Sequence, residues 1–169
     1  MRLNLKDIIN VPGASLPFSY QLDLSGMELN GERPIQEPVA VEGQVQNRGG
    51  ALMLEGTASS VLHLTCDRCT KAFTREKVVP LTTLLATELA DEASEDEIVL
   101  LEDDEVDLDA LTTTAFVLAM ESKNLCSEDC KGICPGCGAD LNAEPCRCKP
   151  EVDPRLAVLA ELLEDKESE

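Results

Sequence analysis

Aromatic side chains are nearly absent from this chain of 169 residues: they make up 2% of it, with no Trp, one Tyr and three Phe. Proteins that bind single-stranded nucleic acid stack the bases on aromatic side chains. The composition therefore argues against a base-stacking surface. Apolar residues still account for 43% of the chain, which is enough to build a hydrophobic core.

Catalytic motifs are lacking as well. His63 is the single histidine, and it falls in a segment of alternating apolar and polar residues, where we interpret it as an ordinary strand residue. The sequence contains no nucleophile elbow, no Walker loop and no Gly-x-Gly-x-x-Gly motif. Its carboxylates occur in runs and not as isolated pairs. We therefore predict that the protein is not an enzyme.

Basic residues are scarce, with 14 Lys and Arg against 33 Asp and Glu, a formal net charge of −19. Phosphate binding requires positive charge, so general nucleic-acid binding is disfavoured. Residues 88–110 carry 12 acids and no base. We interpret residues 88–106 as a mobile acidic segment, which is either a solvated loop or a docking site for a basic protein.

A single cluster of bases stands out against this acidic background. Its members are Arg68, Lys71, Arg75 and Lys77. We consider it the candidate contact for RNA or a partner, and ordinary charge on a strand surface is the alternative.

Long apolar runs are missing, and the N-terminal residues show neither an apolar core nor a cleavage site typical of a signal peptide. We therefore expect a cytoplasmic protein with no membrane partner. In the cytoplasm, closely spaced cysteines indicate metal binding or redox chemistry more than a disulfide framework.

Eight cysteines are the strongest feature that is present. They are Cys66, Cys69, Cys126, Cys130, Cys134, Cys137, Cys146 and Cys148. A Cys-x-x-Cys turn can direct two thiolates at one ion, and Zn²⁺ takes four such ligands. We predict one or two structural zinc ions. Four thiolates also suit iron, but they do not suit Mg²⁺ or Ca²⁺.

The eight thiols can be divided among sites in two ways. In the first, Cys134, Cys137, Cys146 and Cys148 form a local site, and the other four form a long-range site. In the second, Cys126, Cys130, Cys134 and Cys137 form one site, and Cys66 and Cys69 are left unpaired. The sequence does not decide between them. Either four-thiolate site is coordinatively closed, which indicates a structural metal.

The remaining pattern predicts an α+β fold. Residues 1–87 read as a β-rich core, an antiparallel sheet or small open barrel that carries the first Cys-x-x-Cys turn. We expect strands over 19–24, 39–45, 51–65 (with a bulge or turn near Gly56) and 72–79, a turn at Gly49-Gly50, and a short edge strand at 98–101.

Residues 107–169 are expected to contain a helix, the cysteine-rich segment and a terminal helix, packed with the core as one domain. Asp107 is a good N-cap, and the helix after it would bury a face made of Leu108, Leu111, Ala115 and Leu118. Asp153-Pro154 is expected to begin the terminal helix, whose apolar face covers the core or a partner.

The cysteine motifs resemble those of the bacterial YceD family, the large ribosomal RNA subunit accumulation proteins. The resemblance rests on Cys-Asp-Arg-Cys at 66–69, Cys-Ser-Glu-Asp-Cys-Lys-Gly-Ile-Cys-Pro-Gly-Cys-Gly-Ala-Asp-Leu-Asn at 126–142, Cys-Arg-Cys at 146–148 and Asp-Pro-Arg-Leu-Ala at 153–157. It implies a ribosome biogenesis factor that supports 23S rRNA accumulation and meets large-subunit precursors, 23S rRNA or basic ribosomal proteins. The alternative is a rubredoxin-like electron carrier or thiol redox protein, since Cys-Pro-Gly-Cys-Gly at 134–138 also resembles a rubredoxin loop.

Overall fold

The structure is a computed structural model that describes residues 1–88 and 98–148. The chain divides into two compact units. Unit 1 consists of residues 1–65 and 72–124, and unit 2 of residues 66–71 and 125–169. The predicted helix after Asp153 and residues 89–97 of the acidic segment lie outside the described residues.

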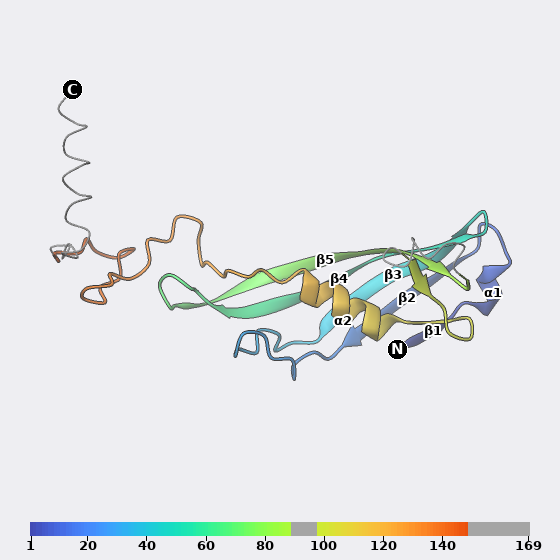
Figure 1. Cartoon of the computed structure of the whole chain (residues 1–169), viewed down its shortest axis with the longest axis horizontal. Helices are drawn as coiled ribbons and strands as arrows, with labels where there is room; N and C mark the ends of the chain where they lie inside the picture. Colours follow the sequence, from blue (N-terminus) through green and yellow to red (C-terminus); the bar gives the residue numbers. More distant parts are fainter. Residues whose placement is uncertain (89–97, 149–169) are drawn as a thin grey trace, which may run out of the picture. The chain divides into compact units, whose positions relative to one another are not determined.

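Unit 1 is built on a five-stranded sheet with the order β2-β3-β4-β5-β6 (Figure 1). The strands are β2 (Ser15–Leu22), β3 (Val39–Arg48), β4 (Ala51–Thr65), β5 (Ala72–Ala86) and β6 (Ile98–Leu100). All pairings are antiparallel except the parallel pairing of β5 with β6. The predicted α+β class and antiparallel sheet are confirmed, and the sheet does not close into a barrel.

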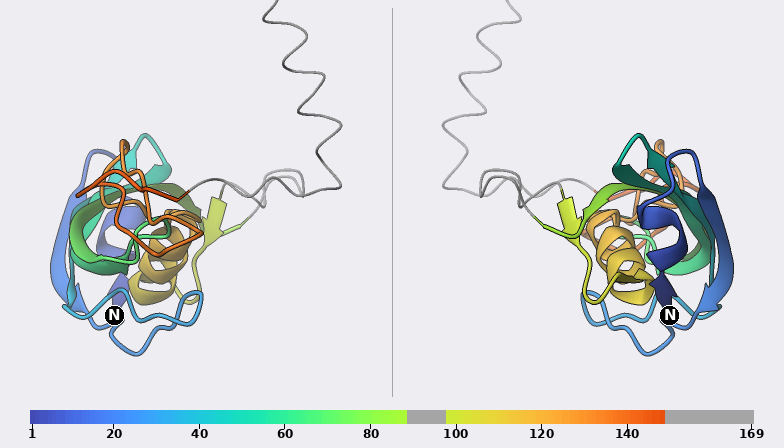
Figure 2. Two further views of the ribbon diagram at one scale, coloured as in Figure 1. Left: turned by 90° about the vertical axis from the view of Figure 1, so that its left-hand side faces the viewer. Right: turned by 90° about the vertical axis from the view of Figure 1, so that its right-hand side faces the viewer.

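Among its described residues, two short strands and two helices complete unit 1. Strand β1 (Arg2–Asn4) pairs with β7 (Glu105–Asp107), and the helices are α1 (Lys6–Ile9) and α2 (Leu108–Leu118). Figure 2 shows α2 on the concave side of the curved sheet. No helix in the described part of the chain has the length and apolar character needed to cross a membrane.

The core face of the sheet follows the predicted period of two. Val39, Val41 and Val45 of β3 are buried, as are the alternating leucines of β4, Leu52, Leu54, Leu62 and Leu64. The turn between β3 and β4 is made by Gly49 and Gly50, which have φ of 70° and 104°. A two-residue turn with both φ positive matches the twist of the strands it joins, and glycine adopts it without strain.

The predicted break near Gly56 was wrong, because β4 runs without interruption and its register holds along both neighbours. Gly56 lies opposite Gly43 of β3. A Cβ at Gly56 would lie 2.5 Å from the carbonyl oxygen of Glu42, and one at Gly43 would lie 2.8 Å from Cζ of Phe18. The glycine therefore marks a close approach of two backbones inside a strand, not the end of one.

Helix α2 begins at its predicted cap. The Asp107 carboxylate accepts hydrogen bonds from the N–H groups of Asp109 and Ala110 at 3.1 and 3.2 Å. The predicted buried face is confirmed in part, because Leu108 is buried and Leu111 and Ala115 are partly buried against the core, whereas Leu118 is exposed. The other buried side chains of the helix are Thr112 and Phe116. Thr112 is tolerated there because its hydroxyl lies 3.3 Å from that of Tyr20. The other apolar stripe of the helix ends at Leu118, whose exposed fraction is 80%.

We expect Gly56→Ala to destabilise unit 1, because the added methyl group would collide with the backbone of β3 at Glu42. That backbone cannot move away without disturbing the hydrogen bonds that β3 makes with β2 and β4. Overpacking of this kind costs about 1–3 kcal/mol. The control is Gly26→Ala, where an added Cβ meets nothing within 4 Å. Chemical denaturation of both variants tests the prediction, and equal unfolding free energies would contradict it.

Candidate metal centres

The first cysteine pair lies on the turn that joins β4 to β5, as predicted. The N–H of Cys66 donates to the carbonyl of Lys71 at 2.9 Å, and the N–H of Thr70 donates to the carbonyl of Cys66 at 2.8 Å. Thr70 has φ of 57°, in the left-handed region. This backbone curls so that residues 66 and 69 present their sulfurs to one side.

The segment from Cys134 to Ala139 repeats the same turn. The N–H of Cys134 donates to the carbonyl of Ala139, and the N–H of Gly138 donates to the carbonyl of Cys134, both at 2.8 Å. Gly138 has φ of 74° and occupies the position that Thr70 holds in the first turn. Two Cys-x-x-Cys turns of one geometry are therefore present in unit 2.

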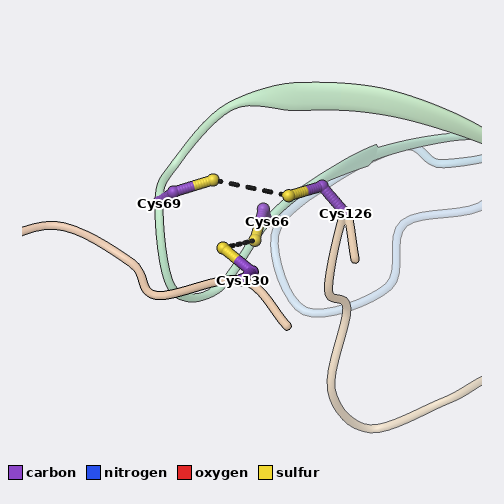
Figure 3. Close-up of side chains that lie close together, drawn as sticks. All are labelled: Cys66, Cys69, Cys126 and Cys130. Carbon is purple, nitrogen blue, oxygen red and sulfur yellow. Dashed lines mark hydrogen bonds between the residues drawn. The ribbon is translucent and has the colours of Figure 1, made fainter. Parts of the chain in front are cut away.

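The first sulfur cluster, which we call site 1, brings together Cys66, Cys69, Cys126 and Cys130 (Figure 3). The sulfurs of Cys66 and Cys130 are 3.8 Å apart, and those of Cys69 and Cys126 are 3.6 Å apart. Cys126 is the exposed member, and the other three are buried. Residues 126 and 130 thus complete the site that the turn begins.

The second sulfur cluster, site 2, consists of Cys134, Cys137, Cys146 and Cys148. The sulfur of Cys146 lies 3.5 Å from that of Cys137 and 3.2 Å from that of Cys134. Cys137 and Cys148 are exposed, so site 2 is more open to solvent than site 1. The grouping follows the first of the two divisions considered above.

Both clusters have dimensions that a metal ion can use. All eight cysteines are free thiols, and within each cluster the sulfur atoms lie within 4.8 Å of one another. Four sulfurs placed tetrahedrally about zinc at ~2.3 Å are separated by roughly 3.8 Å. The sulfur distances of 3.2–3.8 Å are close to this value and far from the ~2.05 Å of a disulfide. Each site can therefore hold a metal ion.

The thiols of each site differ in proton affinity. Hydrogen bonds from backbone N–H groups, first that of Cys126, lower the pKa of Cys66 to about 6, and a hydrogen bond with the Cys69 sulfur raises that of Cys126 to about 12. In site 2 a hydrogen bond from Cys146 lowers the pKa of Cys134 to about 6, and one with Cys137 raises that of Cys148 to about 12. Four negatively charged thiolates at these distances repel one another, so without a cation some of the thiols keep their protons. Binding a metal would therefore release protons.

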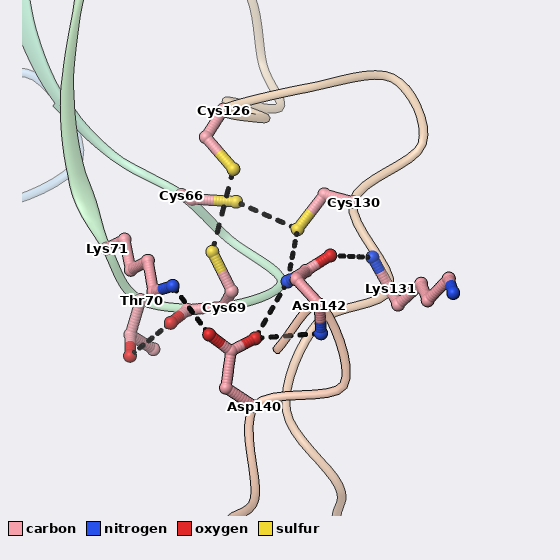
Figure 4. Close-up of polar contacts among 9 residues, drawn as sticks. All are labelled: Cys66, Cys69, Thr70, Lys71, Cys126, Cys130, Lys131, Asp140 and Asn142. Carbon is pink, nitrogen blue, oxygen red and sulfur yellow. Dashed lines mark hydrogen bonds and ion pairs between the residues drawn. The ribbon is translucent and has the colours of Figure 1, made fainter. Parts of the chain in front are cut away.

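A polar network joins site 1 to the loop between Cys137 and Cys146 of site 2 (Figure 4). The carboxylate of Asp140 pairs with the Lys71 ammonium at 2.5 Å and accepts from the N–H and the side-chain amide of Asn142. These contacts, the Lys71 hydrogen bond first, lower the pKa of Asp140 to about 2. Asn142 also donates to the sulfur of Cys130 at 3.5 Å and accepts from the N–H of Lys131. The network fixes the orientation of a candidate ligand from outside its cluster.

Sequence reasoning missed this network. Asp140 and Asn142 stand in the motif Ala-Asp-Leu-Asn that carried the family resemblance, but their spacing gives no sign that they reach Lys71 and Cys130. Gly132 was missed as well. It has φ of 78°, and a Cβ there would lie 2.9 Å from the carbonyl oxygen of Arg68.

The four bases of the predicted cluster all have acidic or carbonyl partners. Arg68 donates to the carbonyl of Cys130 at 2.7 Å, and Lys71 pairs with Asp140. In unit 1, Glu121 lies 2.6 Å from Arg75 and 3.9 Å from Lys77. These contacts do not test RNA binding, which stays a prediction for this cluster.

We predict that Gly132→Ala opens site 1 more than Gly138→Ala does. Both substitutions place a side chain in the left-handed region, at about 1–2 kcal/mol. Only the first also collides with Arg68, since an added Cβ at Gly138 meets nothing within 4 Å. The measurement is the alkylation rate of Cys130, which is 2% exposed, followed by mass spectrometry. Equal rates in the two variants would show that the contact at Arg68 does not hold the site closed.

Comparison with known proteins confirms the family resemblance. The family model described as large ribosomal RNA subunit accumulation protein YceD matches residues 54–163, a range that contains all eight cysteines. No solved structure matches the chain.

Three relatives illustrate the range of similarity. An uncharacterized protein of Mycobacterium tuberculosis is 32% identical over 123 residues, which are 71% of this chain and 59% of that protein. The uncharacterized protein YlbN of Bacillus subtilis is 27% identical over 173 residues, 99% of this chain and 100% of that protein. The chloroplastic large ribosomal RNA subunit accumulation protein YCED homolog 1 of Zea mays is 24% identical over 88% of this chain and 61% of that protein. The chain thus spans less than two thirds of the mycobacterial relative.

Proposed function

This chain belongs to the YceD family of large ribosomal RNA subunit accumulation proteins, and we propose that it is a non-enzymatic factor that supports 23S rRNA accumulation during assembly of the large ribosomal subunit in the cytoplasm. The observation that carries the proposal is the match over residues 54–163, which includes both cysteine clusters. The name of the maize relative, a large ribosomal RNA subunit accumulation protein homolog, supports the link to ribosomal RNA.

Both clusters serve this function as structural zinc sites in our proposal. Four sulfurs per site leave no coordination position for water or substrate, which suits a structural ion. When bound, zinc would join segments that are distant in sequence at site 1 and would close a local loop at site 2. The rubredoxin-like alternative is less well supported, because the chain offers only three Phe and one Tyr to surround a buried iron site. Metal analysis of the purified protein separates the two.

We expect two zinc ions per chain in protein purified under reducing conditions. Cys69→Ser and Cys137→Ser should each lower the content to one, because each removes one ligand from one cluster. Ser127→Ala, which changes a residue inside the Cys126–Cys130 loop and removes no sulfur, should keep both ions. A chelator should empty site 2 before site 1, because Cys137 and Cys148 are exposed. Fewer than one zinc per chain, with disulfides in its place, would refute the assignment.

The charge of the chain indicates what it meets on the ribosome precursor. With a net charge of −19, the protein as a whole repels RNA phosphate and attracts basic ribosomal proteins. Direct RNA contact would require a local patch, and Arg68, Lys71, Arg75 and Lys77 remain the proposed residues. Their existing partners mean that RNA phosphate would have to compete with Asp140 and Glu121.

The cellular test compares rRNA levels in a strain that lacks the gene. We expect the ratio of 23S to 16S rRNA to fall, and the protein to sediment with immature large-subunit particles. The parent gene and Ser127→Ala should restore the ratio. A variant with both Cys69→Ser and Cys137→Ser should not, because it lacks a ligand at each site. A normal ratio in the deletion strain would overturn the proposed function.

A further inference from the structure

A groove of about 620 Å³ lies in unit 1 between α2, β5 and β6. Its apolar wall is formed by Leu81, Val99, Leu100, Leu111, Ala115 and Leu118. A groove of this size, lined largely by apolar side chains, is typical of a binding site. The zinc sites and the match to the family do not account for it.

The groove explains why α2 carries two apolar stripes. Its buried stripe contains Leu108 and Phe116, but the stripe of Leu111, Ala115 and Leu118 faces the groove. Leu118 is 80% exposed, and Leu100 across the groove is 47% exposed. Large aliphatic side chains gathered at one surface hollow mark an interaction site.

The sequence around the groove is strongly acidic. Residues 98–110, which run through β6, β7 and the start of α2, carry six acids and no base. Glu102, Glu105 and Asp107 line the groove, and Arg2 is the one base among the described residues that line it. Asp107 faces Arg2 at 3.9 Å and caps α2, and Glu105 accepts a hydrogen bond from the Asn4 side chain at 3.1 Å. Glu102 is exposed and is therefore the carboxylate best placed to meet a ligand.

We propose that this groove docks a basic segment of a partner protein, with its aliphatic side chains against Leu100 and Leu118 and its Lys or Arg side chains toward the acidic rim. Charge complementarity selects this occupant. RNA is disfavoured because its phosphates would meet carboxylates. A second copy of this chain is disfavoured because a symmetric contact would bring two identical acidic rims together.

The experiment uses the full chain and a synthetic amphipathic peptide of Leu and Lys as the probe. Fluorescence anisotropy gives its affinity, and backbone NMR spectra locate it. Leu100→Gln combined with Leu118→Gln should weaken binding by about tenfold or more. Val78→Gln is the matched control, since Val78 is 55% exposed on β5 and is not among the groove residues. Glu102→Gln should weaken binding more than Glu76→Gln, an exposed carboxylate on β5 that is not among the groove residues.

Three further arms decide the outcome. A peptide with Gln in place of Leu should bind at least about tenfold more weakly, because it lacks the apolar contacts. The proposal would be overturned if the parent protein bound the Gln peptide as tightly as the Leu peptide. It would also be overturned if the variant with Leu100→Gln and Leu118→Gln bound the Leu peptide as tightly as the parent does. Either result would show that binding depends on charge attraction alone and not on the groove. A third result would also overturn it. If replacing Leu156, Leu159 and Leu163 by Gln shifted the NMR signals of the groove residues in the absence of peptide, the chain's own C-terminal segment would be the occupant of the groove. The test is independent of the proposed function, since it measures neither rRNA nor metal.

Discussion

The gathering of eight sulfur atoms into two clusters is the constraint on which unit 2 depends. In its described residues the only buried side chains are four cysteines, Cys66, Cys69, Cys130 and Cys134. Every member of the hydrophobic core cluster belongs to unit 1. Apolar burial therefore does not hold the described residues of unit 2, whose conformation rests on turns and hydrogen bonds and, in our proposal, on bound metal.

This dependence explains the detail around the sulfurs. The two Cys-x-x-Cys turns share one hydrogen-bond pattern and one left-handed residue, Thr70 or Gly138. Asp140 and Asn142 then link the first turn to the segment that carries the second. Zinc would hold these pieces at their sulfur atoms, and the polar network would orient them. Neither the metal sites nor the polar network requires a catalytic group, which is consistent with the proposed role in assembly.

How much the sequence predicts depends on whether a feature is local. The strand faces, the Gly49-Gly50 turn, the Asp107 cap and the turns at Cys66 and Cys134 follow from neighbours in the chain, and they were predicted. The division of the thiols stayed open because it is set by tertiary structure. Gly56 was misread as a break in the strand. Its actual role, a close approach to Gly43 on the neighbouring strand, cannot be inferred from the sequence of one strand alone. The helix face was predicted only in part, because α2 has two apolar stripes and the sequence does not show that Phe116 is buried and Leu118 is exposed.

X-ray absorption at the zinc edge of the purified protein is the most direct test of the account. We predict a first shell of four sulfur atoms at ~2.3 Å, with no nitrogen or oxygen ligand, averaged over both sites. A shell with a nitrogen or oxygen ligand would contradict closed structural sites. A protein without bound zinc, whose sulfur edge shows disulfides, would contradict the claim that metal holds unit 2.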